Sequence, residues 1–390
     1  MIASTARGNH VFAGLSTTVF ETMSRLAREH DAVNLGQGFP DDPGPADVRQ
    51  RAADFAVDGW NQYPPMLGLP ELRSAVATHY AHHQGVTLDP EREVLITSGA
   101  TEAIAAALFA LIEPGDEVVL FQPMYDAYLP LVLRAGGVPR FVTLQPPGWG
   151  LNDEALAAAF SPRTRVVLFN NPLNPTATMF GDDDLARLAR HVVASDAVVI
   201  SDEVWEHVVF DGRPHRTLLG LPELRDRTIK IGSAGKIFSL TGWKVGFACA
   251  APPLRDLVAK AHQFLTFTTP PNLQVAVAYG LAKPDNYFKD MRTGYARSRD
   301  RLADGLTGIG FPVLPSEATW FLNVDLAPLG IEDDVAFCQR LVTEHGVAAI
   351  PVSAFYARDP VSTVVRFCFA KHDATLDRAL GRLATVPLGR

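Results

Sequence analysis

Residues 93–121 read EVLITSGATEAIAAALFALIEPGDEVVLF. The apolar run EVLIT (93–97) predicts a buried strand, and ATEAIAAALFALI predicts a helix directly after it. PGD then turns the chain into EVVLF (117–121), a second buried strand. Two strands joined through a helix form a parallel pair. This stretch therefore predicts a parallel sheet with helices on both of its faces.

The same alternation continues along the chain. Three more apolar runs follow, namely RVVLFNN (165–171), AVVISDE (197–203) and TIKIGS (228–233), with helical stretches such as DDDLARLARHVVAS between them. The tail differs, because FLNVDLA, GVAAIPVS and VVRFCFAK are typical of shorter strands between amphipathic helices. We expect an α/β fold that combines a mostly parallel large domain with a smaller α+β domain.

The expected division of the chain has three parts. Residues 1–45 form an N-terminal arm that joins the small domain, residues 46–284 form the large domain, and residues 285–390 form the C-terminal small domain. A chain of 390 residues is long enough for two such domains.

Composition excludes several classes of protein. With 35 basic and 43 acidic residues the net charge is −8, which disfavours a nucleic-acid-binding protein. Three widely spaced cysteines without a C-x-x-C pair disfavour a disulfide framework and fit a reducing, cytoplasmic compartment. We expect no signal peptide and no membrane span, since no apolar run of about 18 residues occurs.

Four predicted strands are followed by polar segments. TSGATEA follows the first strand, NNPLNPT the third, SDEVWEH the fourth and GSAGK the fifth. In an open parallel sheet, ligands bind beyond the carboxyl ends of the strands. We therefore expect these distant segments to share one rim and to form the functional site.

The segment SGATEA stands where a strand passes into a helix. The free N–H groups and the positive dipole end of a helix start suit a phosphate. An ordinary N-cap by Ser98 or Thr101 explains the same residues, and taken alone it is the simpler interpretation.

Asp202 and Lys236 are the candidates for chemistry at this rim. Asp202 ends an apolar strand, where a carboxylate needs a partner such as a protonated pyridine nitrogen, a helix start or an arginine. Only 7 of the 35 basic residues are lysines. Arginine provides charge equally well but cannot form a carbon–nitrogen double bond as a lysine amine does. Lys236, after a GSAG turn, is thus the candidate nucleophile, and a solvated surface lysine is the alternative.

Six motifs in sequence order resemble the class I/II aminotransferases, which are fold-type I enzymes dependent on pyridoxal phosphate (PLP). They are LGQGFPD, NQYPP, NNPLNPT, SDEVWEHVVFDG, GSAGKIFSLTGWKVGF and VVRFCFAK, and they span residues 35–371. Within the family the chain is most similar to the kynurenine/glutamine/methionine aminotransferases, also described as cysteine-conjugate β-lyases, and to the N-succinyldiaminopimelate aminotransferases.

This resemblance implies an enzyme that moves an amino group from an α-amino acid to a 2-oxo acid. Lys236 would hold PLP as a Schiff base and act as the base, while Asp202 would keep the pyridine nitrogen protonated. Asn174 would bond the ring hydroxyl, and Tyr125 would stack on the ring face. Arg366 would bind the substrate carboxylate through a two-pronged salt bridge.

The resemblance also implies how the phosphate is held. Backbone N–H groups of Ala100 and Thr101 would bind it together with Ser233 and Lys244. Tyr63 in NQYPP is similar to a tyrosine that reaches the phosphate of the neighbouring subunit, so we expect a homodimer with shared active sites.

The substrate side rests on fewer residues. Gly38 is a plausible backbone contact, and Phe20 with Phe267 could form an apolar side-chain pocket, although core packing would give the same pattern. We favour neutral, sulfur-containing or aromatic amino donors. The alternatives are an N-succinyldiaminopimelate-type aminotransferase, which would need an extra cation in that pocket, and a PLP-dependent cysteine-S-conjugate β-lyase.

Two positions depart from the family pattern. Trp205 stands where relatives have a tyrosine three residues after the aspartate, and an indole N–H donates a hydrogen bond but accepts none. Ala177 replaces the glycine of NPTG, which would cost about 1 kcal/mol if the position requires a positive φ.

Three other interpretations are less favoured: a metal site, a transcription regulator and an NAD(P)-dependent enzyme. His79, His82 and His83 have helical spacing suited to a metal, but no carboxylate or cysteine nearby completes the set, so we expect no metal site. A PLP-binding transcription regulator would need a DNA-binding module before LGQGF at residue 35. An NAD(P)-dependent enzyme would need a strand–GxGxxG–helix unit, which is missing.

Overall fold

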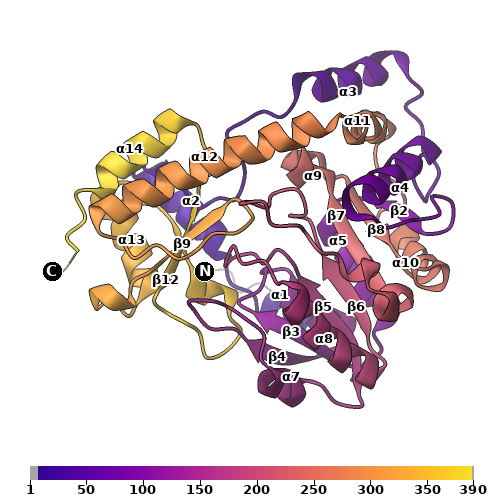
Figure 1. Cartoon of the computed structure of the whole chain (residues 1–390), viewed down its shortest axis with the longest axis horizontal. Coiled ribbons are helices and arrows are strands. Elements are labelled where there is room, and N and C mark those ends of the chain that lie inside the picture. The colour runs from indigo at the N-terminus through magenta and orange to yellow at the C-terminus, as the bar shows by residue number, and fades with distance from the viewer. Residues whose placement is uncertain (1–7, 389–390) are drawn as a thin grey trace.

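A computed structural model of the chain describes residues 8–388. Residues 1–7 of the predicted arm and 389–390 of the predicted small domain lie outside the described residues. The main feature is a seven-stranded sheet in the order β2-β8-β7-β6-β5-β3-β4 (Figure 1). All neighbouring strands run parallel except β8, which is antiparallel to both β2 and β7. The predicted large, mostly parallel sheet is confirmed.

Five of these strands match the predicted apolar runs. The strands are β2 (Val94–Thr97), β3 (Glu117–Gln122), β4 (Val138–Thr143), β5 (Thr164–Asn170), β6 (Val198–Asp202), β7 (Thr228–Ser233) and β8 (Gly246–Cys249). Every residue of β2, β3 and β6 is buried, which is why these strands appear as continuous apolar runs. β4 was not predicted because it lies at the sheet edge, where most of its residues stay partly exposed.

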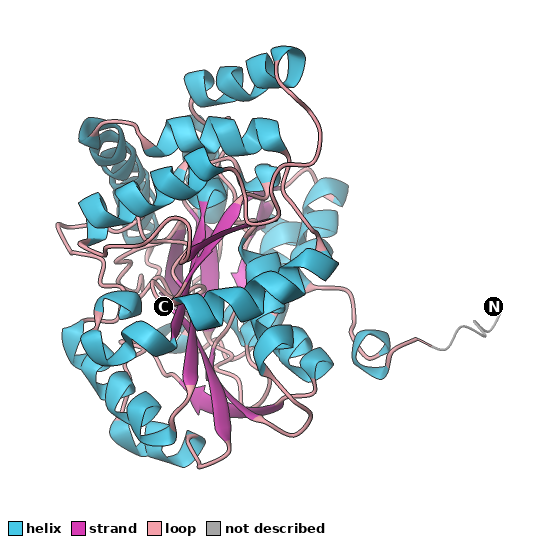
Figure 2. Ribbon diagram, turned by 90° about the vertical axis from the view of Figure 1, so that its right-hand side faces the viewer, coloured by secondary structure: helices cyan, strands magenta, loops and turns pink. Residues whose placement is uncertain are grey.

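Helices cover both faces of the sheet (Figure 2). Side chains of successive strand residues point to opposite faces, so Leu168 packs in one core cluster with Ile104 of α5, whereas Val167 packs in another with Leu188 of α8. The helices of this part are α3 (Ala46–Asp58), α4 (Pro70–Gln84), α5 (Ala100–Leu111), α6 (Tyr128–Ala135), α7 (Asp153–Ala159), α8 (Asp182–Ser195), α9 (Ala234–Ile237), α10 (Pro252–Leu265) and α11 (Pro271–Leu281).

A second group of elements is built around a small antiparallel sheet in the order β11-β12-β9. Its strands are β9 (Phe321–Asp325), β11 (Ile350–Pro351) and β12 (Val364–Cys368), and its helices are α13 (Asp334–His345) and α14 (Asp373–Leu383). Near the N-terminus, α1 (His10–Ala13) and α2 (Val19–Glu29) precede β1 (Val33–Asn34), which pairs with β10 (Val347–Ala348).

The long helix α12 (Asp285–Ile309) connects the two groups of elements (Figure 1). It begins beside α11 and ends against α14, one of the helices grouped with the small sheet. Among residues 8–388, no helix combines the length and the apolar character that crossing a bilayer requires.

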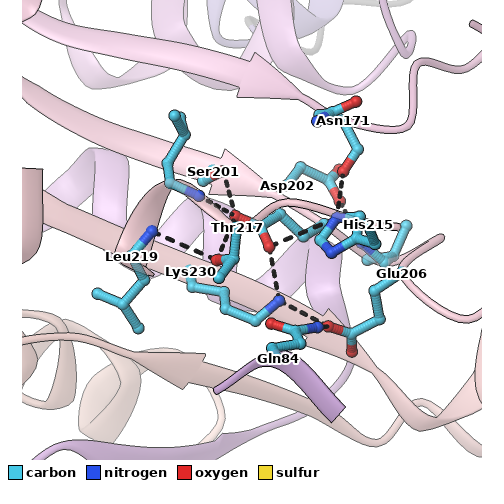
Figure 3. A network of polar contacts seen from close by, with 12 residues as sticks. Gln84, Asn171, Ser201, Asp202, Glu206, His215, Thr217, Leu219 and Lys230 are labelled. Carbon is cyan, nitrogen blue, oxygen red and sulfur yellow. Dashed lines mark hydrogen bonds and ion pairs between the residues drawn. The ribbon is translucent and has the colours of Figure 1, made fainter. Parts of the chain in front are cut away.

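A buried ionic network lies beneath the large sheet's rim (Figure 3). The Nζ atom of Lys230 on β7 donates to Glu203 at 2.7 Å and to Glu206 at 2.6 Å, and all three side chains are at most 1% exposed. The hydroxyl of Thr217 donates to Glu203, and that of Tyr80 donates to Glu206. Burial alone would lower the pKa of Lys230, but the two carboxylates raise it above its usual value.

Replacing Lys230 with methionine tests how strongly this network stabilises the fold. Lys230→Met leaves two buried carboxylates without their cation, so the free energy of unfolding should fall by about 3–5 kcal/mol. The matched control is Lys260→Met, which removes an exposed lysine and should change stability by less than about 0.5 kcal/mol. Both values come from equilibrium urea unfolding. Equal changes in the two variants would contradict a stabilising role for the network.

Candidate active site

The carboxyl ends of β2, β5, β6 and β7 lie at one rim of the large sheet, as the sequence predicts. The segments that follow these strands enclose a cavity of about 210 Å³. Its lining includes Ala100, Thr101, Tyr125, Asn174, Asp202, Trp205, Ser233, Lys236 and Lys244. All the predicted cofactor-binding residues except Tyr63 thus come together from five separate parts of the chain.

Asp202 is the buried acid of this cavity and is 5% exposed. The Tyr128 hydroxyl donates a hydrogen bond to its Oδ2 atom at 2.5 Å, and the Val204 N–H donates to its Oδ1 atom at 3.3 Å. Burial raises the pKa of Asp202, and these two hydrogen bonds and the charge of Lys236 oppose that rise. A carboxylate in this setting is suited to a cationic partner such as a protonated ring nitrogen.

Lys236 lies on the short helix α9 and its amine is enclosed by aromatic rings. The Nζ atom is 4.6 Å from the ring centroid of Trp205 and 4.9 Å from that of Trp320. Burial lowers the pKa of Lys236 to about 8, although Cys368 and Asp202 act in the opposite direction. An amine with a lowered pKa is a better nucleophile and base at neutral pH than a solvated lysine.

The start of α5 fits a phosphate. Its N-cap is Gly99, which has φ +82° and offers no side chain to the first N–H groups of the helix, those of Ala100 and Thr101. The predicted alternative, a cap by Ser98 or Thr101, is not formed. A Cβ atom on Gly99 would lie 3.2 Å from Cε of Lys244, so glycine lets that lysine approach the helix start. Uncapped N–H groups beside a cation bind anions.

Arg366 marks a second cavity of about 280 Å³, which shares Lys236 and Asn174 with the first. Its side chain is 1% exposed, and its guanidinium donates to Oδ1 of Asn174 at 2.8 Å and to the Gly36 carbonyl at 3.1 Å. The Nε atom is buried and has no hydrogen-bond partner among the described residues. Burial lowers the pKa of Arg366. This arrangement fits a carboxylate ligand that would satisfy the remaining donors.

Gly38 and Phe20, two of the predicted substrate-binding residues, both line the second cavity. A Cβ atom on Gly38 would lie 2.6 Å from Cζ of Phe321, whose ring centroid is 3.8 Å from Cζ of Arg366. Glycine therefore allows Phe321 to lie against the guanidinium.

Phe267 does not join Phe20. It lies beyond the end of α10, lines neither of the two cavities, and contacts Tyr63 with a ring-centroid distance of 5.6 Å. Tyr63 is 79% exposed and Phe267 is 40% exposed. The sequence-based pairing of Phe20 with Phe267 is therefore wrong within one subunit, where Phe267 contacts Tyr63 instead.

Sequence reasoning missed several residues of the site, among them four with polar side chains. Tyr128 contacts Asp202, the Asn170 amide donates to the Asp202 backbone carbonyl at 2.8 Å, Thr241 lines both cavities, and Asp126 lines the second. Tyr128 is the third residue after Tyr125 on the same turn, so helical spacing was the only local signal of its position.

The two departures from the family pattern have different consequences. Trp205 is 2% exposed and packs edge-to-face on Trp320, so it forms a wall around the Lys236 amine. Ala177 has φ +63°, which costs about 1 kcal/mol relative to glycine. Its methyl group is fully buried in the small-sheet core and contributes a stabilisation of similar size, about 0.8 kcal/mol. Alanine is therefore tolerated there.

Comparison with known proteins agrees with this geometry. The model of the family described as aminotransferase class I and II matches residues 30–383. The probable N-succinyldiaminopimelate aminotransferase DapC of Mycobacterium tuberculosis is 47% identical over 95% of this chain and 96% of that protein. The methionine aminotransferase of Escherichia coli is 42% identical, again over 95% and 96% of the two chains.

A solved structure of N-succinyldiaminopimelate aminotransferase from Mycobacterium tuberculosis has a TM-score of 0.94. It covers 97% of this chain and 99% of that one at 47% identity. The chain therefore belongs to the class I and II aminotransferases, a family whose members use PLP.

Proposed function

We propose that the chain moves the amino group of a neutral α-amino acid, sulfur-containing or aromatic, to a 2-oxo acid at Lys236. The observation that carries the proposal is the meeting of three groups around two adjoining cavities. They are the amine of Lys236, the buried carboxylate of Asp202 and the guanidinium of Arg366. An amine, an acid for a ring nitrogen and a carboxylate receptor are the groups that transamination requires.

The residues of the first cavity suit PLP. When bound, PLP supplies a ring that withdraws electrons from the substrate Cα and stabilises the negative charge left there. Asp202 would face its ring nitrogen, Tyr125 its ring face, and the start of α5 with Ser233 and Lys244 its phosphate. Lys236 would hold its aldehyde carbon covalently.

Lys236 is proposed to carry the proton that leaves and returns during the reaction. The pKa of Lys236, lowered to about 8, favours the unprotonated amine near neutral pH more than the pKa of a solvated lysine does. The rings of Trp205 and Trp320 lie on one side of the amine and reduce its contact with water there. Arg366 would hold the substrate α-carboxylate, and Asn174 keeps the guanidinium oriented through its 2.8 Å hydrogen bond. Together these residues would bring the Cα–H bond to the amine.

The second cavity favours a neutral substrate side chain. Phe20, Phe39 and Phe321 line it, and its charged residues are Asp126, Lys236 and Arg366. With Arg366 engaged by the α-carboxylate and Lys236 by the chemistry, no cation in this lining is left for a distal carboxylate. The negative charge of Asp126 would also repel a distal carboxylate. The names of the relatives include both methionine and N-succinyldiaminopimelate aminotransferases, so these names do not decide between a neutral and an acidic substrate side chain. The lining of the second cavity is the feature that favours a neutral one.

A homodimer in the cytoplasm is part of the same proposal. Tyr63 and Phe267 are exposed side by side and away from their own cavities, as expected for residues that serve a neighbouring subunit. Trp60 and Phe264 are 74% and 87% exposed. Helix α1 projects from the body of the chain (Figure 2) and carries Phe12, which is 51% exposed. Apolar exposure on this scale favours a second copy of the chain as the occupant.

The role of Lys236 is tested by Lys236→Ala. Removal of the amine deletes both the covalent attachment and the proton carrier, so kcat for transamination should fall by about 10³-fold or more. The variant should still bind PLP noncovalently, which absorbance spectroscopy would detect and which would also show that it folds. Lys260→Ala, at an exposed position, should keep normal kcat. Near-normal turnover of Lys236→Ala would reject the site assignment.

The role of Tyr128 is tested by Tyr128→Phe. Loss of a hydrogen bond to an ionised carboxylate is worth about 1.5–3 kcal/mol, so kcat/KM should fall by roughly 10- to 100-fold. The pKa of Asp202 should rise, and the pH dependence of the bound cofactor's absorbance should shift with it. Tyr356→Phe is the control, since its hydroxyl donates to the Leu144 carbonyl away from both cavities. Unchanged kinetics and spectra in Tyr128→Phe would contradict this role.

The substrate class is tested by a panel of amino donors. Methionine and phenylalanine should have kcat/KM values at least about 10-fold above that of N-succinyl-L,L-diaminopimelate. Asp126→Asn should narrow that gap, because it removes the negative charge from the side-chain cavity. Formation of pyruvate and thiol from a cysteine S-conjugate would measure β-elimination in the same panel. A wild-type preference for the succinylated donor would overturn the proposed specificity but not the transamination itself.

A further inference from the structure

Four of the chain's 11 histidines gather at one place outside the active site. His79, His82 and His83 lie on α4, and His207 lies in the segment after β6. The ring centroid of His83 is 4.4 Å from that of His79, 4.6 Å from that of His82 and 5.0 Å from that of His207. None of the four lines either cavity of the active site.

The carboxylate that the sequence lacks near these histidines comes from Asp285. This residue is the first of α12 and lies 203 positions after His82 in the chain. Nε2 of His82 and Oδ1 of Asp285 are 2.7 Å apart. One ligand atom from each of His82, His83 and Asp285 lies within 4.8 Å of the others. The expectation of no metal site rested on a missing carboxylate, and the fold supplies it.

The two buried histidines are engaged with other partners. Nε2 of His79 bonds Nε2 of His207 at 2.7 Å, and Nδ1 of His79 bonds the Leu281 carbonyl at 3.3 Å. The outer three residues differ, because His82 and Asp285 are exposed and His83 is half-buried. A cation from solvent would therefore meet two imidazoles and one carboxylate.

The ring of His83 is held in position by its neighbours. It packs against His79 and His207, and its centroid is 4.8 Å from that of Phe288, a fully buried residue of α12. Asp285 belongs to the first turn of that helix, so its backbone is fixed as well. Ligands held by packing lose little side-chain freedom when they bind a metal.

From this geometry we propose that His82, His83 and Asp285 bind one Zn²⁺ ion and join the last turn of α4 to the first turn of α12. Imidazole nitrogen and carboxylate oxygen are zinc ligands at about 2.0–2.2 Å, which puts them about 3.3 Å apart in a tetrahedral site. The ligand atoms lie within 4.8 Å of one another, so metal binding would require side-chain rotations that bring them to that spacing. Solvent exposure leaves the fourth position to water.

The position of the site gives the ion a structural effect. α12 is the helix that links the large sheet to the small one (Figure 1), so the ion would anchor the start of that link to the large domain. An ion that binds only the folded chain stabilises it by mass action. At a free Zn²⁺ concentration of about 100 times Kd, the thermal midpoint should rise by roughly 3–5 °C.

The test is isothermal titration of PLP-loaded enzyme with ZnCl₂ in a buffer that does not chelate metals. One saturable site per chain is expected in the wild type. His83→Gln and Asp285→Asn should each weaken binding by at least about 10-fold and should abolish the zinc-dependent rise in the thermal midpoint. For each variant, the thermal midpoint is compared with and without zinc. This difference cancels the loss of the ordinary His82–Asp285 contact in Asp285→Asn.

Matched controls separate this site from binding elsewhere. His30→Gln removes an exposed histidine from α2's C-terminal end, and Asp290→Asn removes an exposed carboxylate from α12 itself. Both should bind Zn²⁺ as the wild type does, whereas Mg²⁺ should not bind, because that ion prefers oxygen ligands. Far-ultraviolet circular dichroism, PLP absorbance and kcat should be normal in all four variants. Equal zinc affinity in His83→Gln and the wild type, or no saturable binding, would overturn the proposal.

Discussion

The position of β6 between β5 and β7 is the constraint on which the site depends. In this register Asp202 pairs with Asn170 on one side and with Ile231 on the other. Asp202 therefore ends its strand at the rim, where Tyr128 reaches it, while the next residue, Glu203, points below the rim to Lys230. A shift of one residue would exchange these faces and put the wrong carboxylate in the cavity. Catalytic geometry and the buried ionic network therefore share one strand.

Burial has different consequences for Lys230 in the ionic network and for Lys236 in the first cavity. Around Lys230 two carboxylates satisfy the buried charge, and the amine stays protonated as a structural cation. Around Lys236 aromatic rings replace the carboxylates, so burial lowers its pKa and prepares the amine for chemistry. Arg366 is also buried among rings, and its Nε atom has no hydrogen-bond partner within residues 8–388. Lys236 and Arg366 therefore lack some polar partners within the described residues, and a cofactor and a substrate would supply these partners.

The proposed specificity and assembly both rest on apolar side chains. Phenylalanines from different elements line the second cavity together with Asp126, whose negative charge would disfavour an acidic substrate side chain. Tyr63 and Phe267 form an exposed aromatic pair outside both cavities of their own chain, and the proposed homodimer would bring this pair to the partner's site. The proposed zinc site likewise joins residues that are remote in sequence, at the start of the helix that connects both parts of the chain.

The sequence by itself determined five strands of the large sheet, because strands buried on both faces are continuous apolar runs, and it determined that polar segments follow the carboxyl ends of four of them. It did not determine β8, which is equally buried. It also singled out Lys236, since only an amine can do the covalent chemistry. Tertiary structure alone decided the edge strand β4, the contact of Tyr128 with Asp202, the separation of Phe267 from Phe20, and the approach of Asp285 to His82. Local patterns report burial and periodicity, whereas these contacts depend on register and on helix crossings between residues far apart in the chain.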